Sequence, residues 1–298
     1  MMALLKIIRG CLAIAYLCVL ILLVNVAQMC SLSLLIFSRP MFMQFNMEMN
    51  QLWCGQVGWM AILCGNKLVV TGDKPRRENA LAFANHQSLI DAIMIWYWAS
   101  HDRITGWIRW FAKYELKFVP GLGWGMQFVN TLFVKRNWSQ DASTIKATFA
   151  KLRNSGLPTW LMIFPEGTRA TPAKIAASQE FAKRKGLPVL DRVLLPRGKG
   201  ISASLQGMEG LFRAVYDITI YYEGPIPGLF KFYTEGGCVV HLHCKRYDIS
   251  EVPTRERELN TWLLNVFQEK NAKIAGALSA EQGQTPSTSP LVVGYSND

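Results

Sequence analysis

The sequence predicts an α/β protein in which a mostly parallel sheet is flanked by helices and preceded by an N-terminal membrane-embedded helical hairpin. Two observations predict this class. Residues 11–38 contain no charged side chain, which is typical of a segment that enters a membrane. After residue 66, short apolar runs of strand length alternate with longer helix-like runs, as they do in parallel sheets covered by helices.

The N-terminal hairpin is predicted from two uncharged runs. At about 1.5 Å per residue, residues 11–38 are long enough to cross a ~30 Å hydrocarbon core. Residues 49–66 are also uncharged, but the amide side chains of Asn50, Gln51 and Gln56 make this run a borderline span. Lys6 and Arg9 precede the pair of runs and Lys67 follows it, which indicates that both ends lie on the cytoplasmic side.

A secretory signal peptide is the alternative interpretation of the first run. The run is longer than a typical signal sequence and lacks a clear small-x-small cleavage site, so the membrane hairpin is favoured. We therefore expect a membrane protein of the bacterial inner membrane or of an endoplasmic-reticulum-type membrane, with its active site facing the cytoplasm.

The second part of the chain shows the alternation of short and long apolar runs in detail. Predicted strands are residues 67–71, 80–84, 130–134, 159–164, 193–195, 215–222 and 238–244. Predicted helices are residues 88–100, 142–154, 172–185 and 255–277. The last residues are rich in Ser, Thr, Gln, Gly and Pro, which is typical of disorder. The predicted organisation is a hairpin (1–66), an α/β domain (67–277) and a disordered tail (278–298).

The charge balance is basic and indicates the kind of partner. Lys and Arg number 32 against 21 Asp and Glu, giving a formal net charge of +11. Such a balance suits anionic lipid headgroups or an acidic carrier protein. The basic residues are dispersed, and the chain has no zinc-finger or helix-turn-helix pattern, so nucleic-acid binding is not predicted.

The first chemical motif follows the predicted strand 80–84. It reads Asn-His-Gln-Ser-Leu-Ile-Asp and places His86 five positions before Asp91. A histidine can take a proton from an alcohol near neutral pH, and a carboxylate beside it can hold the ring in one tautomer. The pair alone does not identify a reaction, because the same spacing also occurs by chance.

Cationic residues at the ends of other apolar runs predict a phosphate site. The predicted strand 159–164 leads directly into Pro-Glu-Gly-Thr-Arg. In this loop Gly167 lets a backbone approach a ligand, Thr168 supplies a hydroxyl, and Arg169 supplies a fork suited to phosphate. A turn with a surface salt bridge is the alternative for this motif by itself. Phosphate binding is favoured because three more cations end apolar segments, namely Lys113, Lys135 and Arg136.

The order of these motifs resembles the glycerolipid acyltransferase family. The motifs are Asn-His-x4-Asp at 85–91, Lys-x-Glu-Leu-x3-Pro-x2-Gly from Lys113, Phe-x2-Arg ending at Arg136, Phe-Pro-Glu-Gly-Thr-Arg at 164–169 and an apolar segment ending at Pro196. The best-known members are the 1-acylglycerol-3-phosphate acyltransferases. Within the family, the chain is most similar to the branch that holds lysocardiolipin acyltransferases and eukaryotic-type lysophosphatidate acyltransferases, of which Arg197 after Pro196 is typical.

The resemblance implies a role for each matching residue. His86 matches the general base and Asp91 its carboxylate partner. Lys113, Arg136, Glu166, Gly167, Thr168 and Arg169 match the acceptor phosphate-binding site, and Pro196 matches the acyl-donor region. His241 and His243 share one face of a predicted strand, but no further ligands accompany them, so no metal site is predicted.

The resemblance further implies a reaction. A long acyl chain moves from acyl-CoA or acyl-carrier protein to the sn-2 hydroxyl of 1-acylglycerol 3-phosphate, giving phosphatidate without a cofactor. No Gly-x-Ser-x-Gly motif offers a nucleophile for an acyl-enzyme. Two alternatives stay open: acylation of another lysophospholipid, such as lysocardiolipin or lysophosphatidylglycerol, and a non-catalytic lipid-binding membrane protein.

Overall fold

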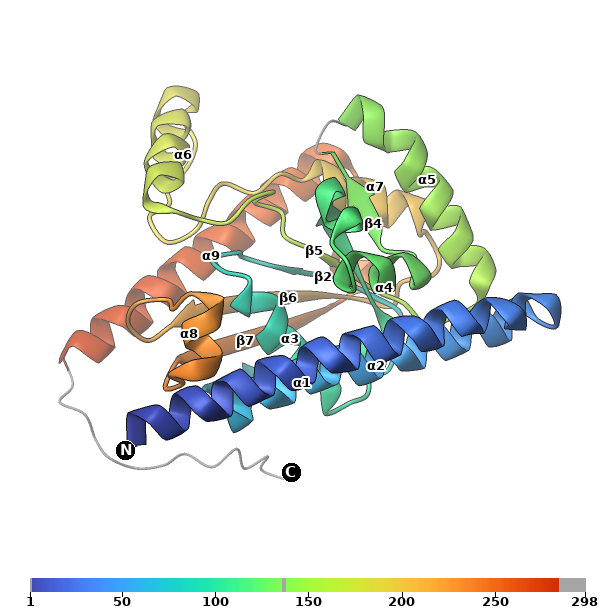
Figure 1. Ribbon diagram of the computed structural model, residues 1–298. Helices are drawn as coiled ribbons and strands as arrows, with labels where there is room; N and C mark the ends of the chain where they lie inside the picture. The colour runs from blue at the N-terminus through green and yellow to red at the C-terminus, as the bar shows by residue number, and fades with distance from the viewer. Residues whose placement is uncertain (1, 136–137, 284–298) are drawn as a thin grey trace, which may run out of the picture.

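A seven-stranded mixed sheet forms the centre of the protein. The computed structural model describes residues 2–135 and 138–283, and within them the strand order is β1-β7-β6-β2-β5-β3-β4 (Figure 1). The strands are β1 (Lys67–Gly72), β2 (Ala80–Ala84), β3 (Ile108–Lys113), β4 (Leu132–Val134), β5 (Trp160–Ile163), β6 (Ala214–Tyr222) and β7 (Val239–Asp248). Every neighbouring pair is parallel except β6 with β7. The predicted fold class is confirmed.

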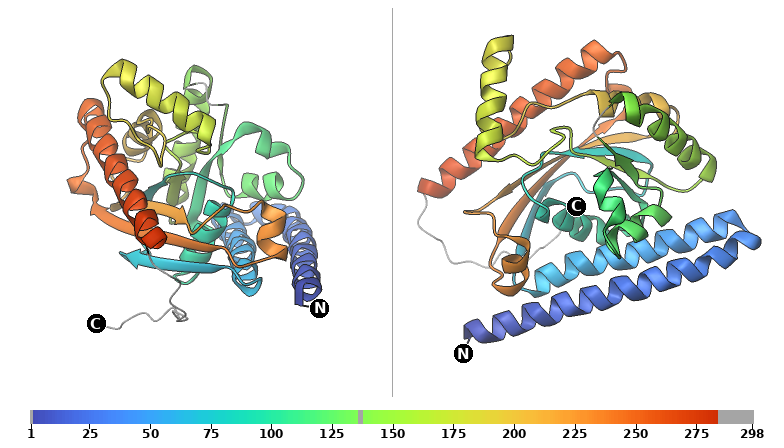
Figure 2. Two further views of the ribbon diagram at one scale, coloured as in Figure 1. Left: turned by 90° about the vertical axis from the view of Figure 1, so that its left-hand side faces the viewer. Right: turned by 45° about the horizontal axis from the view of Figure 1, so that its top comes forward.

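Helices cover both faces of this sheet. They are α1 (Met2–Cys30), α2 (Arg39–Leu63), α3 (Ile90–Ser100), α4 (Leu122–Phe128), α5 (Trp138–Ser155), α6 (Pro172–Lys185), α7 (Lys199–Gly207), α8 (Leu229–Thr234) and α9 (Glu256–Gly283). The long antiparallel helices α1 and α2 lie along one side with α3, whereas α5, α7 and α9 lie along the other (Figures 1 and 2). Helix α6 projects away from the body of the molecule.

The strand directions bring the predicted motifs to one edge of the sheet. β2, β3, β4, β5 and β6 all run the same way, so their carboxyl ends meet at one edge. The histidine motif follows β2, the glutamate motif follows β5, and Lys113 ends β3. This is the edge at which open α/β sheets hold their ligands.

Alternate side chains of the central strand β2 belong to different apolar clusters. Ala80, Ala82 and Ala84 pack with buried residues of the hairpin and α3. Leu81 and Phe83 pack with buried residues of α5, α7 and α9. All five β2 residues are fully buried, as expected for a parallel strand covered on both faces.

The hairpin is joined closely to the domain. Gly58 of α2 lies against Tyr97 of α3, where a Cβ atom on residue 58 would come within 2.7 Å of the Tyr97 backbone. Inside the hairpin, the buried Asn46 amide donates to Ser31 Oγ at 2.9 Å. The helices therefore pack as part of the domain instead of extending from it as a separate unit.

One segment of the described chain is long and apolar enough to cross a membrane, Ala3–Ile36. Its outward face is apolar, and Leu12, Leu23 and Met29 are each 60–66% exposed. At the end of the segment, Ile36 and the next residue, Phe37, are more exposed than these three side chains. Such a continuous exposed apolar surface is typical of membrane contact.

Two strand predictions differ from the structure. Residues 193–195 are not a strand: Val193 and Leu194 are buried in an irregular segment, so their apolar character reflects burial without strand pairing. Strand β3 was not predicted, because Arg109 and Lys113 interrupt its apolar pattern. The Arg109 guanidinium is nevertheless 1% exposed and donates to the Gly106 carbonyl at 2.6 Å.

The helix predictions also need correction. The short helices α4, α7 and α8 were not predicted, because none is long enough to show a clear helical period. Helix α9 continues to Gly283, beyond the predicted end at residue 277, so the first residues of the predicted tail are helical. The rest of that tail, 284–298, lies outside the described residues.

A buried lysine attaches α9 to the sheet. Lys270 is 1% exposed, and its ammonium group donates to the Ile218 carbonyl at 2.6 Å and to Thr219 Oγ1 at 3.2 Å. It also forms an ion pair with Asp217, which is 7% exposed. Because all of these partners belong to β6, one charged side chain fixes the position of the last helix.

We expect Lys270→Met to lower the free energy of unfolding by ~3–5 kcal/mol, because it leaves the Asp217 carboxylate buried without its cation. Urea denaturation in detergent micelles, followed by tryptophan fluorescence, measures the change. Lys273→Met is the matched control, since Lys273 is exposed on the same helix. Equal effects of the two substitutions would contradict the anchoring role.

Candidate active site

The loop after β2 is held in place by a buried amide. Asn85 is fully buried, and its Nδ2 donates to the Ile220 carbonyl at 2.7 Å. Its Oδ1 accepts the Ile220 N–H at 2.8 Å. The β2–β6 ladder ends at Ala84 and Ile218, so the Asn85 side chain takes the place of the next backbone pair. The main chain is thereby free to turn away from the sheet at His86.

His86 and Asp91 contact each other as the sequence predicts. His86 Nδ1 lies 2.8 Å from Asp91 Oδ2, with the histidine side chain 15% exposed and the aspartate side chain fully buried. A carboxylate only accepts hydrogen bonds, so Nδ1 carries the proton in this contact. Nε2 is therefore the nitrogen left to accept a proton from another molecule.

The surroundings of Asp91 hold its carboxylate in one orientation. Oδ2 also accepts the backbone N–H groups of Gln87, at 2.7 Å, and Ser88, at 2.9 Å. Oδ1 accepts the hydroxyl of Tyr222, the last residue of β6. The carboxylate lies in the first turn of α3, where a negative charge is favoured by the helix dipole.

Aromatic rings connect His86 to an apolar pocket. The His86 ring stacks on Phe164, with centroids 4.0 Å apart and planes 12° apart. Phe164 in turn stacks on Trp110 of β3 at 5.4 Å. Trp110 is also part of the pocket wall, so the pocket begins two rings away from the histidine.

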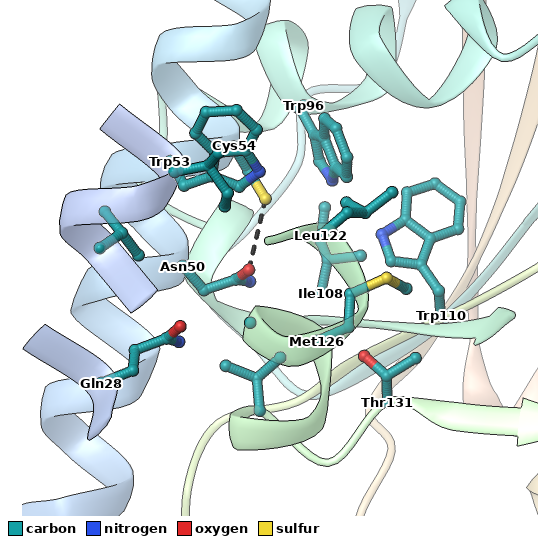
Figure 3. A pocket seen from close by; sticks show the side chains of 14 residues that line it. Gln28, Asn50, Trp53, Cys54, Trp96, Ile108, Trp110, Leu122, Met126 and Thr131 are labelled. Atoms are coloured by element: carbon teal, nitrogen blue, oxygen red, sulfur yellow. Dashed lines mark hydrogen bonds between the residues drawn. The ribbon is translucent and has the colours of Figure 1, made fainter. Parts of the chain in front are cut away.

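The pocket lies between the N-terminal hairpin and the sheet (Figure 3). Ile21 and Val24 come from α1, Trp53 comes from α2, and Leu122 and Met126 come from α4. Figure 3 shows the side chains of Trp96, Trp110, Ile108 and Met126 gathered around its interior. The lining is mostly apolar, and the open space inside is about 20 Å³, enough for about one water molecule and too small for an alkyl chain.

The glutamate loop after β5 contacts the histidine loop through its backbone. The Ala170 N–H donates to the His86 carbonyl at 2.7 Å, and the Gly167 N–H donates to the Phe164 carbonyl at 3.0 Å. Gly167 has φ +68°, a left-handed conformation that favours glycine. The turn at Gly167 thus brings residues 164–170 alongside His86.

Glu166 points into the protein instead of into solvent. It is 2% exposed, and both carboxyl oxygens are shielded from solvent. Burial raises the pKa of Glu166 well above its ordinary value, and the Asp91 carboxylate adds to this rise, while the backbone N–H groups of Leu194 and His86 oppose it. The side chain is thus a buried acid next to the His86 loop.

Cationic side chains surround the outer part of this loop. Arg169 is exposed, and Lys174 of α6 donates to the Thr168 hydroxyl. The exposed Arg197 side chain lies beside Gly167, within 4 Å of the position that a Cβ atom would occupy there. Sequence analysis did not assign Lys174 to the site, because it belongs to none of the motifs. It treated Arg197, which follows Pro196 in the fourth motif, only as typical of one branch of the family.

The remaining predicted residues lie nearby or outside the described chain. Lys113 ends β3 and pairs with Glu115 at 3.3 Å. Lys135 lies over the Tyr114 ring at 5.1 Å. Arg136 lies outside the described residues. Pro196 precedes Arg197, whose N–H donates to the Pro165 carbonyl at 2.9 Å, so the fourth motif adjoins the glutamate loop.

This arrangement can support general-base chemistry on a phosphorylated amphiphile. A histidine with one nitrogen fixed by a carboxylate leaves the other free for proton transfer. Cations in the loop next to it suit a phosphate. The helical hairpin has an apolar outer face, which suits the alkyl chain of an amphiphile.

Comparisons with known proteins agree with this chemistry. The family profile described as "Acyltransferase" matches residues 67–223, and the profile described as "Acyltransferase C-terminus" matches residues 234–275. The first match covers both catalytic candidates, the glutamate loop and Pro196. The second covers β7 and most of α9.

Curated relatives carry names of one enzyme class. The chain is 34% identical to 1-acyl-sn-glycerol-3-phosphate acyltransferase 2 of Brassica oleracea, over 76% of this chain and 59% of that protein. It is 32% identical to 1-acyl-sn-glycerol-3-phosphate acyltransferase gamma of Homo sapiens, over 84% of this chain and 69% of that protein. The chain spans 55–65% of the length of three of the plant relatives it matches.

A solved structure shares the fold. The 1-acyl-sn-glycerophosphate acyltransferase PlsC of Thermotoga maritima superposes with a TM-score of 0.50 at 18% identity, over 89% of this chain and 98% of that one. The profile match over more than half of the chain, together with the human relative, confirms the family predicted from the motifs. The chain belongs to the acyltransferase family.

Proposed function

We propose that this protein transfers an acyl chain from an acyl thioester to the sn-2 hydroxyl of 1-acylglycerol 3-phosphate and so forms phosphatidate at a membrane surface. The contact of His86 Nδ1 with Asp91 at 2.8 Å, beside the cationic glutamate loop, carries this proposal. The names of the curated relatives support the same acceptor.

In the proposed reaction, His86 Nε2 takes the proton of the acceptor hydroxyl as the hydroxyl oxygen attacks the thioester carbonyl. The carbon–sulfur bond then breaks, and the leaving thiolate receives the proton from the imidazolium. Asp91 keeps Nδ1 protonated and stabilises the imidazolium while it exists. The oxygen attacks the donor directly, so no side chain becomes acylated.

The cations around Gly167 are proposed to bind the acceptor phosphate. Arg169 offers a planar fork that matches phosphate oxygens, and Arg197 and Lys174 add positive charge on either side of the loop. Buried Glu166 is proposed to position this loop instead of touching the phosphate, because its carboxyl group faces the interior.

The alkyl part of the substrates is proposed to lie against the exposed apolar face of α1, beside the pocket of Figure 3. This face suits the hydrocarbon core, and Ile21 and Val24 of the same helix line the pocket. In this proposal His86 lies at the membrane surface on the cytoplasmic side, where acyl-CoA or acyl-carrier protein supplies the thioester.

A donor-by-acceptor activity matrix tests this function. Acyl-CoA and acyl-carrier protein are each offered with 1-acylglycerol 3-phosphate, lysocardiolipin or lysophosphatidylglycerol, and products are identified by mass spectrometry. We expect phosphatidate as the main product. If only another lysophospholipid is turned over, the proposed acceptor is wrong and that lysophospholipid takes its place. If no donor–acceptor pair consumes the thioester, non-catalytic lipid binding is favoured.

We expect His86→Ala to lower kcat by about 10²–10⁴, the usual cost of removing a positioned general base. The protein should stay folded, because the side chain is at the surface end of the motif and Asn85 still holds the loop. His101→Ala is the control, since His101 follows the opposite end of α3 from Asp91. A folded His86→Ala protein with the wild-type rate would rule out the base.

For Arg169→Ala we expect the KM for 1-acylglycerol 3-phosphate to rise about 10- to 100-fold, the scale of losing ~1.5–3 kcal/mol from a hydrogen bond to a charged group. Steady-state kinetics with a phosphorylated and a neutral lysolipid measure the effect. Arg184→Ala, which removes an exposed arginine of α6, should leave both KM values unchanged. If Arg169→Ala raises the KM only for the neutral lysolipid, Arg169 does not bind the phosphate.

A further inference from the structure

Tyr222 contacts the catalytic pair from a strand that carries none of the sequence motifs. It is the last residue of β6 and shares a sheet face with Ile218 and Ile220, which pack in the same apolar cluster as α3. That face directs its hydroxyl to Oδ1 of Asp91. Tyr222 is 4% exposed and Asp91 is fully buried, so the contact is shielded from water.

The two oxygens of Asp91 have different partners. Oδ2 accepts three donors, which are His86 Nδ1 and the N–H groups of Gln87 and Ser88. Within residues 2–135 and 138–283, Tyr222 is the hydrogen-bond donor to Oδ1. Without that hydroxyl, a buried carboxylate oxygen has no partner, and only the donors to Oδ2 hold the plane of the carboxylate.

The phenol is suited to act as a permanent donor. Burial, together with the negative charge of Asp91, raises the pKa of Tyr222 well above its ordinary value. The hydroxyl therefore stays protonated throughout the range in which a histidine titrates. The hydrogen bond draws part of the carboxylate charge away from the imidazole and holds the plane of the carboxylate at the same time.

We propose that Tyr222 is a positioning residue for acyl transfer, which holds Asp91 in the orientation that fixes the tautomer and plane of His86. This inference rests on the proposed general-base role of His86. It predicts an effect on the catalytic step and on the titration of His86, and none on acceptor affinity, because the Tyr222 hydroxyl donates to Asp91 and not to the cations around Gly167.

The test compares Tyr222→Phe with Tyr233→Phe in the full chain. Tyr233 is also 4% exposed, and its hydroxyl donates to the Val57 carbonyl at 3.1 Å, in the contact between α8 and α2. Each substitution removes one buried hydroxyl and keeps the ring. A loss that comes only from weaker packing or stability should therefore be similar in both variants.

We expect Tyr222→Phe to lower kcat about 10- to 100-fold with an unchanged KM for 1-acylglycerol 3-phosphate. The acidic limb of the pH–rate profile should move to higher pH, because Asp91 then directs more of its charge to the imidazolium. Three other titratable groups face this network: Glu166 from the loop after β5, Lys270 of α9 and Cys238. The charge of Lys270 lowers the pKa of Glu166, and Cys238 raises the pKa of Tyr222. All of them are unchanged in the variant.

A spectroscopic measurement separates this inference from the proposed function. The chain has four histidines, so the His86 ring signal can be assigned with a His86→Gln variant and titrated by NMR in micelles. Tyr222→Phe should move the midpoint of the His86 titration to higher pH, and Tyr233→Phe should leave it in place. The NMR titration tests the role of Tyr222 even if no acceptor is turned over. The absence of turnover would reject the proposed function but not this inference.

Two results would overturn the inference. One is a folded Tyr222→Phe protein with the wild-type kcat and His86 titration, and the other is an equal response in Tyr233→Phe. If Tyr222→Phe does not fold, replacement of Tyr222 by 3-fluorotyrosine, which keeps the hydroxyl but makes it a stronger donor, provides the comparison. A changed His86 titration then supports the positioning role, and an unchanged one rejects it.

Discussion

The Asn85 amide forms two hydrogen bonds with the backbone of Ile220, and the rest of the site depends on this pairing. The parallel ladder between β2 and β6 stops at Ala84, and the side chain continues it for one more step. The main chain can therefore leave the sheet at His86 without exposing unpaired groups of β6. Had the backbone continued the ladder instead, His86 would be a strand residue and could not face Asp91 at the start of α3.

Three separate segments meet at the loop that Asn85 holds. Asp91 receives its donors from the loop itself and from the end of β6. The glutamate segment joins through the Ala170 N–H and the His86 carbonyl, and Arg197 joins through the Pro165 carbonyl. Backbone hydrogen bonds thus connect the base, the cationic loop and the proposed donor region, so a shift in one segment is transmitted to the others.

The two faces of the sheet serve different purposes. The face toward α1, α2 and α3 carries an apolar pocket and an exposed apolar helix, whereas the opposite face is closed by α5, α7 and α9. The edge of the sheet that carries the candidate active site also carries the cations around Gly167. A charged edge near an exposed apolar helix fits the proposed amphiphilic substrate, whose phosphate and alkyl chain need different environments.

The sequence by itself determined the fold class, the order of the motifs and the His86–Asp91 pair, because strand-length apolar runs and a fixed local spacing are properties of neighbouring residues. It could not reveal β3, since Arg109 is hidden by carbonyls supplied by its own turn, and it wrongly made residues 193–195 a strand, since burial alone made them apolar. Only the tertiary structure decided that Tyr222 reaches Asp91 and that Arg197 lies at Gly167. Such contacts join residues far apart in the chain, so the local sequence around either residue does not predict them.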